Sequence, residues 1–407
     1  MKNEREIQSG DFVNMITKCE FCGGALKFDA DIQMLVCEHC TSMFPVTETE
    51  EEKALTDKTP SDLHENAEND LMDCREYECK SCGARLIIND VETATYCAYC
   101  GQPTIVFDRI AIHRRPKYII PFSITKDYAI ANIREKFIQG EFVPDEIKNF
   151  KPDLLRGIYV PYLLYDIRIK DRQLIKGQYS EDKDSNSSSR FFYREAAGSF
   201  HEIPVDASQK LSNESSERLE PFYERGMTDF KVEYLSGFYA DLMDSNPEHL
   251  KTIALSRARD MFNEQVIKSV PATSCNLIEN RPHYEFEQEE YALFPVWFMV
   301  FHRNEETYTI MVNGQTGKVV GGLPANEDKL IHRSLLLGII LSVIGFILLP
   351  AMYALGSEVQ EWANYLIMFG IPTLTLGGYR NIKSLKKSLA LTSSKSIKDF
   401  VSERQDS

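Results

Sequence analysis

Cys19-Glu-Phe-Cys22, followed by Cys37-Glu-His-Cys40, recurs sixty residues later as Cys79-Lys-Ser-Cys82 and Cys97-Ala-Tyr-Cys100. Fourteen residues separate the two pairs in each copy, which indicates one short module present twice. A Cys-x2-Cys pair at a tight turn directs two thiolates at one ion, and a second pair completes a tetrahedron. The spacing therefore predicts two structural Zn2+ ions, each held by one quartet in a small β zinc ribbon.

Other chemistries for the quartets are two disulfides per module or a rubredoxin-like iron site, and His39 could replace one cysteine as a ligand. Glycine follows the inner cysteine at Gly23, Gly83 and Gly101, where a positive φ is expected, and Thr41 is the exception. Four thiolates leave no position open for substrate, so the sites are expected to be structural and not catalytic.

Charge and cysteine usage narrow the class of protein. The chain has 407 residues, enough for two or three domains, and a net charge of −15, which disfavours nucleic acid as a partner. Metal-bound thiolates require a reducing compartment, and no secretory signal opens the chain, so the N-terminal part is expected in the cytosol. Cys74 and Cys275 are single thiols and are expected to be inert packing residues.

Composition divides the chain into six parts. Residues 41–78 carry twelve acidic and three basic side chains, which is typical of a solvated tether, and the ribbons are expected to be loosely held beads. The expected order is ribbon 1 (1–46), an acidic linker (47–73), ribbon 2 (74–104), an α+β region (105–328), a transmembrane hairpin (334–379) and a basic tail (380–407).

The α+β region repeats one order of elements. A helix over Asp127–Ile138 precedes a long strand starting at Gly157, whose hairpin loop is Ser180–Ser189. Later, Asn246-Pro247 caps a helix containing Leu250 to Phe262, with Ser245 and Glu248 in capping-box register. A strand at Leu293–Phe301 and its partner at Thr307–Val312 follow, with a turn at 313–317. The region is predicted to contain two related α+β modules.

Two apolar runs near the C-terminus predict membrane spans. Residues 334–355 lack charge and are long enough to cross a hydrocarbon core of about 30 Å, and residues 362–379 form a second uncharged run. Basic residues flank the pair only on its outer sides, so the positive-inside rule predicts a multi-pass protein of the cell membrane with both termini in the cytoplasm. The basic tail is expected to contact membrane lipids.

Four further stretches carry a resemblance to a known family. They are Gly157-Ile-Tyr-Val-Pro-Tyr-Leu-Leu-Tyr-Asp166, Ile203-Pro-Val-Asp-Ala-Ser208, Tyr234-Leu-Ser-Gly-Phe-Tyr-Ala240 and Val312-Asn-Gly-Gln-Thr-Gly-Lys-Val-Val-Gly-Gly-Leu-Pro324. With the ribbons, they resemble the bacterial zinc-ribbon membrane proteins of the YdjG type. The resemblance implies a non-enzymatic component of a phage-shock-type envelope-stress response, whose cytosolic part recruits a phage-shock protein A-like coat protein.

No sequence motif of a known catalytic site occurs, so no catalytic or cofactor-binding residue is predicted besides the metal ligands. The favoured hypothesis is a membrane-anchored scaffold that presents its ribbons and α+β region to cytosolic proteins. A nucleic-acid-binding regulator is the first alternative, and an enzyme with an unrecognised cleft in the α+β region is the second.

Overall fold

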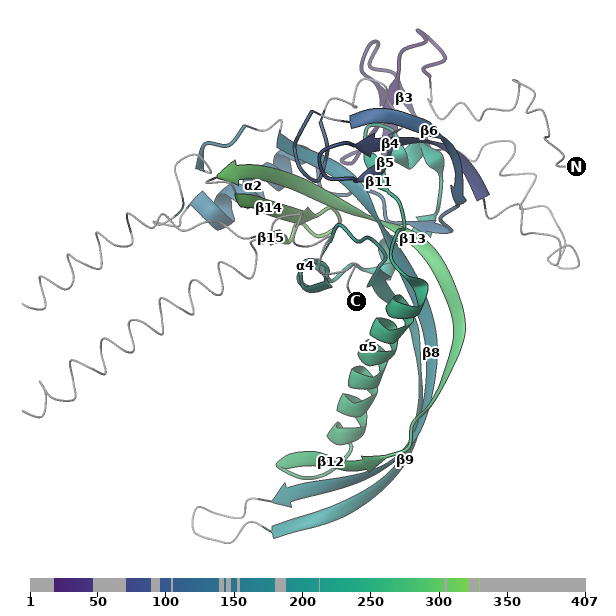
Figure 1. The fold of residues 1–407 in the computed structure, drawn as a ribbon, viewed down its shortest axis with the longest axis vertical. Coiled ribbons are helices and arrows are strands. Elements are labelled where there is room, and N and C mark those ends of the chain that lie inside the picture. Colours follow the sequence, from purple (N-terminus) through teal and green to yellow (C-terminus); the bar gives the residue numbers. More distant parts are fainter. Residues whose placement is uncertain are drawn as a thin grey trace, which may run out of the picture.

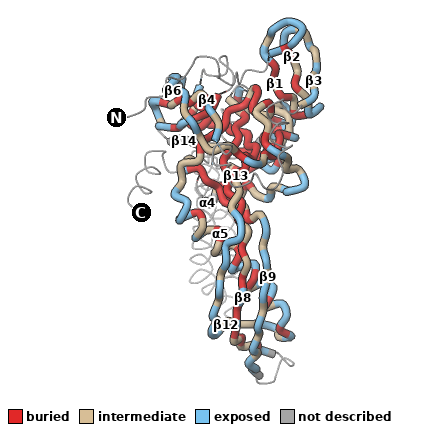
Figure 2. Tube along the Cα trace, turned by 90° about the vertical axis from the view of Figure 1, so that its right-hand side faces the viewer, coloured by how far each residue is buried: buried red, intermediate tan, exposed pale blue. Residues whose placement is uncertain are grey.

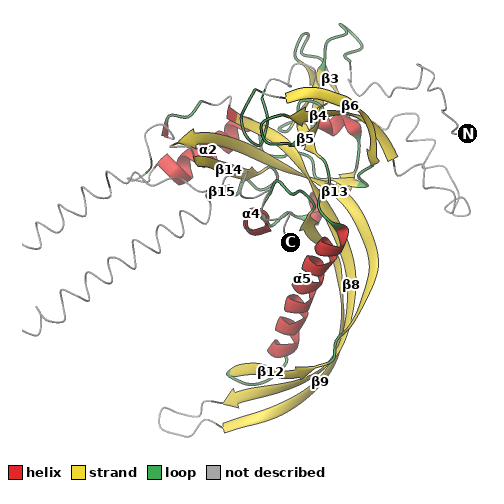
Figure 3. Cartoon of the chain, in the orientation of Figure 1, coloured by secondary structure: helices red, strands yellow, loops and turns green. Residues whose placement is uncertain are grey.

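A computed structural model describes residues 18–46, 71–88, 96–103, 105–138, 143, 148–151, 154–179, 188–211, 213–303, 306–321 and 329. Within these ranges most regular structure is strand (Figure 3). The strands are β1 (Leu26–Asp29), β2 (Met34–Cys37), β3 (Met43–Phe44), β4 (Leu71–Cys79), β5 (Arg85–Ile88), β6 (Ile105–Arg114), β7 (Tyr118–Ile119), β8 (Leu155–Tyr179), β9 (Ser188–Asp206), β10 (Thr228–Asp229), β11 (Tyr239–Asp241), β12 (Ser274–Asn280), β13 (His283–Arg303), β14 (Glu306–Asn313) and β15 (Val319–Gly321). The helices are α2 (Lys126–Ile138), α4 (Asn213–Leu219) and α5 (Pro247–Lys268), with 3-10 turns η3 (Glu224–Gly226) and η4 (Val232–Leu235).

The strands form two sheets. β1, β2 and β3 make a three-stranded antiparallel sheet, which is ribbon 1. The other twelve belong to one sheet whose main path runs β10-β7-β13-β8-β11-β5-β4-β6. Ribbon 2 supplies β4 and β5 to this path, so it is part of the large sheet and not a separate bead.

The long strand β8 organises the large sheet. Its 25 residues, at about 3.3 Å each, extend roughly 80 Å. It pairs antiparallel with β9 and β13 along most of its length, and the three strands curve together while α5 lies along the inner side of the curve (Figure 1). Gly157 lies where the ring of Phe238 crosses the strand, and a Cβ there would meet that ring at 2.4 Å.

Side chains of β8 are buried on both faces of the sheet. Tyr159 and Leu163 belong to one hydrophobic cluster, whereas Val160 and Tyr162 belong to a second, which also contains three cysteines of ribbon 2. Buried residues are concentrated in the upper part of the molecule as drawn in Figure 2. They become fewer along the curved arm, which is the lower part formed by β8, β9 and β12. Such two-sided burial explains why the first half of this strand, from Gly157 to Tyr165, is a continuous run without charged residues.

Several predicted elements are confirmed. The helix predicted at Asp127–Ile138 is α2, and the strand predicted at Leu293–Phe301 lies inside β13 and pairs with β14. α5 starts after Asn246, whose side-chain oxygen accepts a hydrogen bond from the Glu248 N–H at 3.0 Å. The cap is therefore Asn246 and not Ser245 of the predicted capping box.

The prediction of two α+β modules is wrong. The two similar stretches are halves of one sheet, because their long strands β8 and β13 pair antiparallel from Leu155 and Met299 to Lys170 and His283. Pairing between strands more than a hundred residues apart leaves no mark in either local sequence. The described region is mainly β, and the predicted fold class is corrected accordingly.

The predicted membrane spans at 334–355 and 362–379, the basic tail at 380–407 and most of the acidic linker lie outside the described residues. Across the described ranges, no helix is both long enough and apolar enough to cross a membrane. The longest of them, α5, has 22 residues but carries charges along its length. The transmembrane hairpin in the predicted fold class and the predicted multi-pass location are therefore not retained.

Candidate metal centres

Each cysteine pair is held by the same small backbone turn. The N–H of the residue after the second cysteine donates to the carbonyl of the first, as in Gly23 to Cys19 and Gly83 to Cys79, both at 2.8 Å. The N–H of the first cysteine donates to the carbonyl five residues on, as in Cys19 to Gly24 at 2.8 Å. This turn brings the two thiols of each pair to the same side of the chain.

The position after the second cysteine has a positive φ in all four turns. Gly23, Gly83 and Gly101 have φ of 72°, 67° and 70°, as predicted from the role of glycine. Thr41, the exception in the sequence, has φ of 59° and makes the same hydrogen bond to Cys37. The turn therefore overrides the preference of a β-branched residue for negative φ, at a conformational cost.

The turns assemble the predicted quartets into two clusters. In each, the four sulfur atoms lie within 4.8 Å of one another. Cys19 and Cys40 are 3.4 Å apart and Cys82 and Cys97 are 3.7 Å apart, close to the ~3.8 Å edge of a tetrahedron with metal–sulfur bonds of ~2.3 Å. A disulfide would bring two sulfurs to ~2.05 Å, and none of the ten cysteines forms a disulfide.

The geometry thus gives two groups of four cysteines that could hold a metal ion, and the predicted disulfide alternative does not describe them. His39 is exposed and belongs to neither group, so its predicted role as a substitute ligand gains no support. Of the two cysteines outside these groups, Cys74 is buried and Cys275 is half-buried.

Hydrogen bonds around the thiols shift their pKa values. Hydrogen bonds with the side chain and backbone of Ser42 lower the pKa of Cys40 to about 6. In ribbon 2, hydrogen bonds with Cys82 and Cys97 lower the pKa of Cys100 to about 2, while the pKa of Cys97 is raised by its cysteine neighbours. A cation would bind all four sulfurs as thiolates, so each cluster is a site where metal binding displaces protons.

Ribbon 2 is seated in the core of the large sheet. Its strand β5 pairs antiparallel with β11, and Ala98 and Tyr99, between two of its cysteines, are 1% and 5% exposed. The Tyr99 hydroxyl donates to Oδ2 of Asp241 at 2.6 Å, and the Ser208 hydroxyl donates to the same oxygen. Burial, reinforced by the charge of Asp244, raises the pKa of Asp241 to about 7.

Ribbon 1 touches the body through a smaller contact. The N–H of Phe28 donates to the carbonyl of Ser236 at 3.0 Å, and its ring meets that of Tyr234 edge-on. The Gln33 side chain donates to the carbonyl of Phe122 at 2.8 Å. Residues 234–241 therefore hold both ribbons, since Tyr239 to Asp241 pair with ribbon 2.

The cysteine spacing predicts the two groups that could hold a metal ion, but not the residues that seat the ribbons. Ser208, Asp241 and Ser236 lie in or beside stretches quoted above for family resemblance, where nothing pointed to contact with a ribbon. Tyr99 and Asp241 are 142 residues apart, so only tertiary structure brings them together. The pair Ala98-Tyr99 is a signal in the sequence, because alanine is often fully buried and tyrosine is often partly buried.

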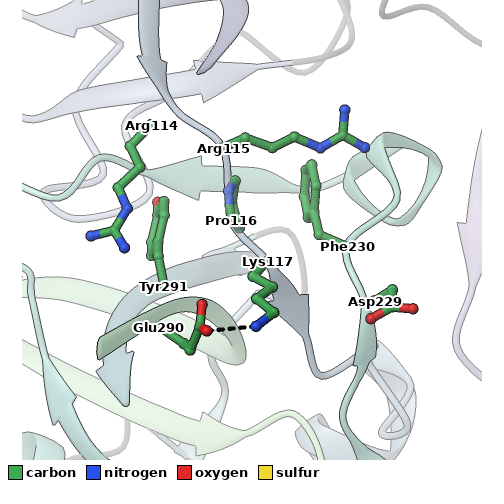
Figure 4. A pocket seen from close by; sticks show the side chains of 8 residues that line it. All are labelled: Arg114, Arg115, Pro116, Lys117, Asp229, Phe230, Glu290 and Tyr291. Carbon is green, nitrogen blue, oxygen red and sulfur yellow. Dashed lines mark hydrogen bonds and ion pairs between the residues drawn. The ribbon is translucent and has the colours of Figure 1, made fainter. Parts of the chain in front are cut away.

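A half-open cavity of about 260 Å3 lies between the β6–β7 link, β10 and β13 (Figure 4). Lys117 and Glu290 form an ion pair at 2.5 Å across it, and the Arg115 guanidinium lies 5.5 Å from the centre of the Phe230 ring. Burial alone would lower the pKa of Lys117, but the hydrogen bond to Glu290 gives a net increase. Lys117 is therefore held as a cation in this cavity.

Fold and sites together define a β-rich protein with two four-cysteine ribbons that could each hold a metal ion, one inside its sheet and one beside it. The chain is 28% identical over 238 residues, covering 55% of this chain and 68% of the relative, to an uncharacterized protein, YdjG, of Bacillus subtilis (strain 168). That similarity agrees with the resemblance seen in the sequence and assigns no activity. No protein-family model matches the chain, and no solved structure matches it.

Proposed function

We propose that this protein is a non-enzymatic scaffold, stabilised by two structural zinc ions, that uses ribbon 1 to dock a partner protein. The main observation behind this proposal is that the second knuckle has different surroundings in the two ribbons. Ala98 and Tyr99 of ribbon 2 are buried against the protein's own sheet, whereas Glu38 and His39 at the same places in ribbon 1 are exposed. Ribbon 1 thus has both knuckles available to another molecule, whereas ribbon 2 has its second knuckle buried.

The docking surface is an apolar patch on ribbon 1, formed by Phe21, Met43 and Phe44. Phe21 is 76% exposed and Met43 58% exposed, and the Phe21 ring stacks on Phe44 with centroids 5.7 Å apart. Aromatic and methionine side chains of this kind are enriched in protein interfaces. Exposed Glu20 adjoins the patch, so it fits a partner that offers apolar side chains with a basic flank.

Zinc is the metal we propose for both clusters. Four thiolates in a closed tetrahedron suit Zn2+, and ribbons with four cysteine ligands are structural sites that contribute folding energy. An iron site of rubredoxin type would use the same donors, so metal analysis decides between them. Elemental analysis of the purified protein should give a zinc-to-chain ratio near two, and a coloured, iron-loaded protein would refute this assignment.

Resemblance to proteins of the YdjG type makes a phage-shock protein A-like coat protein the first partner to test. The test compares proteins that co-purify, after mild crosslinking, with wild type, Phe21→Ser and Phe191→Ser. Phe191 is 62% exposed on β9, so it controls for loss of an exposed aromatic ring elsewhere. A partner lost with Phe21→Ser and kept with Phe191→Ser supports docking by ribbon 1, whereas a partner kept by both variants contradicts it.

A further inference from the structure

The cysteines of the two ribbons differ in how easily solvent reaches them. In ribbon 1, Cys19 and Cys37 are buried, whereas Cys22 is exposed. In ribbon 2, three of the four cysteines are buried, and Cys82, at the place equivalent to Cys22, is half-buried. Among the eight cysteines of the two quartets, Cys22 is therefore the one that a dissolved reagent reaches most easily.

The residue after each first knuckle contributes to this difference. In ribbon 1 it is Gly24, and a Cβ at this place would lie 3.3 Å from the sulfur atoms of both Cys22 and Cys37. The equivalent residue of ribbon 2 is Ala84, which is fully buried and whose carbonyl accepts the same hydrogen bond from the first cysteine. Because the two turns share this geometry, the methyl group of Ala84 occupies the place that Gly24 leaves open beside the sulfur atoms.

A second sulfur atom lies next to the exposed one. The Sγ atoms of Cys22 and Cys37 are 3.5 Å apart. Metal binding holds all four sulfurs of a quartet as thiolates, and the thiolate is the form of cysteine that attacks an oxidant. Since both ribbons share this thiolate character, exposure decides which cysteine is oxidised first.

We propose that Cys22 is an oxidation site through which peroxides remove zinc from ribbon 1. The Cys22 thiolate attacks one oxygen of hydrogen peroxide, the O–O bond breaks, and a sulfenic acid forms while the leaving hydroxide takes up a proton to give water. The Cys37 thiolate then attacks the Cys22 sulfur, a disulfide forms, and the sulfenic hydroxyl leaves as a second water after protonation. Two thiolates together lose two electrons, and one peroxide is reduced to two waters.

The disulfide would alter the docking patch of ribbon 1. It takes two of the four ligands and draws their sulfurs to ~2.05 Å, so ribbon 1 releases its zinc and loses the tetrahedral arrangement of its knuckles. The patch depends on that arrangement, because Phe21 of the first knuckle stacks on Phe44, which follows the second knuckle. Oxidation should therefore weaken docking. The zinc and the docked partner rest on the proposed function, whereas the exposure of Cys22 and its distance from Cys37 do not.

The test treats the zinc-loaded full chain with hydrogen peroxide and follows released zinc with a colorimetric chelator. The first zinc per chain should appear at least about tenfold faster than the second, because the cysteines of ribbon 2 are shielded. Mass spectrometry, after alkylation of the remaining thiols, should find a disulfide between Cys22 and Cys37. Dithiothreitol with added zinc should reverse both changes, since a disulfide can be reduced whereas a sulfinic acid cannot.

Two glycine-to-alanine variants test the open place beside the sulfur atoms. Gly24→Ala gives ribbon 1 the residue that ribbon 2 carries, and it should slow release of the first zinc by about threefold or more. Gly198→Ala, on β9 of the curved arm, adds a methyl group that makes only ordinary contacts, and it should release zinc as wild type does. Elemental analysis confirms that each variant is loaded with zinc before oxidation, and the wild-type rates decide the proposal if Gly24→Ala is not.

Equal release rates for the two zinc ions, no release of zinc, or a disulfide that lacks Cys22 would overturn the proposal. So would a zinc-loaded Gly24→Ala that releases zinc as fast as wild type. A partner that is lost with Phe21→Ser but stays bound to oxidised wild type would show that oxidation does not control docking. A partner kept by Phe21→Ser would instead refute docking by ribbon 1, and the oxidation of Cys22 would still be decided by the zinc release.

Discussion

The two ribbons share one backbone design and have different surroundings. All four cysteine turns repeat the same hydrogen bonds and the same positive φ, yet ribbon 2 supplies two strands to the large sheet, while ribbon 1 keeps a sheet of its own whose apolar side chains join the main core cluster. The difference arises from the residues between the ligands: Ala98 and Tyr99 in one, Glu38 and His39 in the other. The ligand spacing is the same in both ribbons, and the two residues inside the second knuckle are buried in ribbon 2 and exposed in ribbon 1.

Removing one ligand from each ribbon gives the largest expected contrast. Cys97→Ser should lower the free energy of unfolding of the sheet by more than ~4 kcal/mol, because metal loss unfolds a ribbon whose strands belong to that sheet. Cys37→Ser should lower the free energy of unfolding of the large sheet by only ~1 kcal/mol, because the three strands of ribbon 1 form a separate sheet. Urea denaturation followed by circular dichroism measures both, and equal losses would show that the ribbons are equally coupled to the body.

Replacing the residue before the last cysteine of each quartet, Tyr99 or His39, tests how far that residue holds its ribbon against the body of the protein. Tyr99→Phe removes a donor from buried Asp241 and should cost ~2 kcal/mol. His39→Phe, at the equivalent exposed place in ribbon 1, should change stability by less than ~0.5 kcal/mol. Thermal unfolding of the zinc-loaded proteins compares them, and an inert Tyr99→Phe would mean that the hydrogen bond does not hold ribbon 2.

The free energy of unfolding should also depend on pH through Asp241, which holds Tyr99 of ribbon 2. Burial raises the pKa of Asp241 to about 7, so the folded state binds a proton that the unfolded state releases near pH 4. The contribution of Asp241 is therefore present at low pH and is lost as pH rises through about 7, by ~1.4 kcal/mol between pH 6 and 8. Asp241→Asn should flatten that part of the stability profile, and an unchanged slope would assign it to other groups.

The smallest effect concerns the one turn without glycine. Thr41→Gly should stabilise ribbon 1 by ~0.5 to 1 kcal/mol, because it relieves a β-branched residue at φ of 59°. The reverse change, Gly101→Thr, should cost ribbon 2 ~1 to 2 kcal/mol. A Cβ at Gly101 would have no atom within 4 Å, so the cost would be conformational only. The zinc affinity of each variant can be measured by competition with a chelator. Tighter zinc binding by Gly101→Thr than by wild type would contradict the expected strain.

Sequence reasoning predicted what is local in this molecule. The cysteine quartets, the helix α2, the start of α5 and the hairpin of β13 and β14 follow from spacing, capping and alternation within short windows. It could not predict that β8 and β13 pair, that β5 joins β11, or that Tyr99 meets Asp241, because these partners are distant in the chain. These missed features are pairings between distant segments, and the expectation that ribbon 2 is a separate bead failed for that reason.

The distance between Tyr99 and Asp241 also sets an order of events during synthesis. A ribosome adding 5 to 20 residues per second would need roughly 7 to 30 seconds to make the 142 residues from one to the other. Both thiol quartets are complete long before the strand that covers ribbon 2 emerges. We therefore expect nascent chains to take up metal first and close the sheet over it afterwards, so that metal supply during translation governs the yield of folded protein.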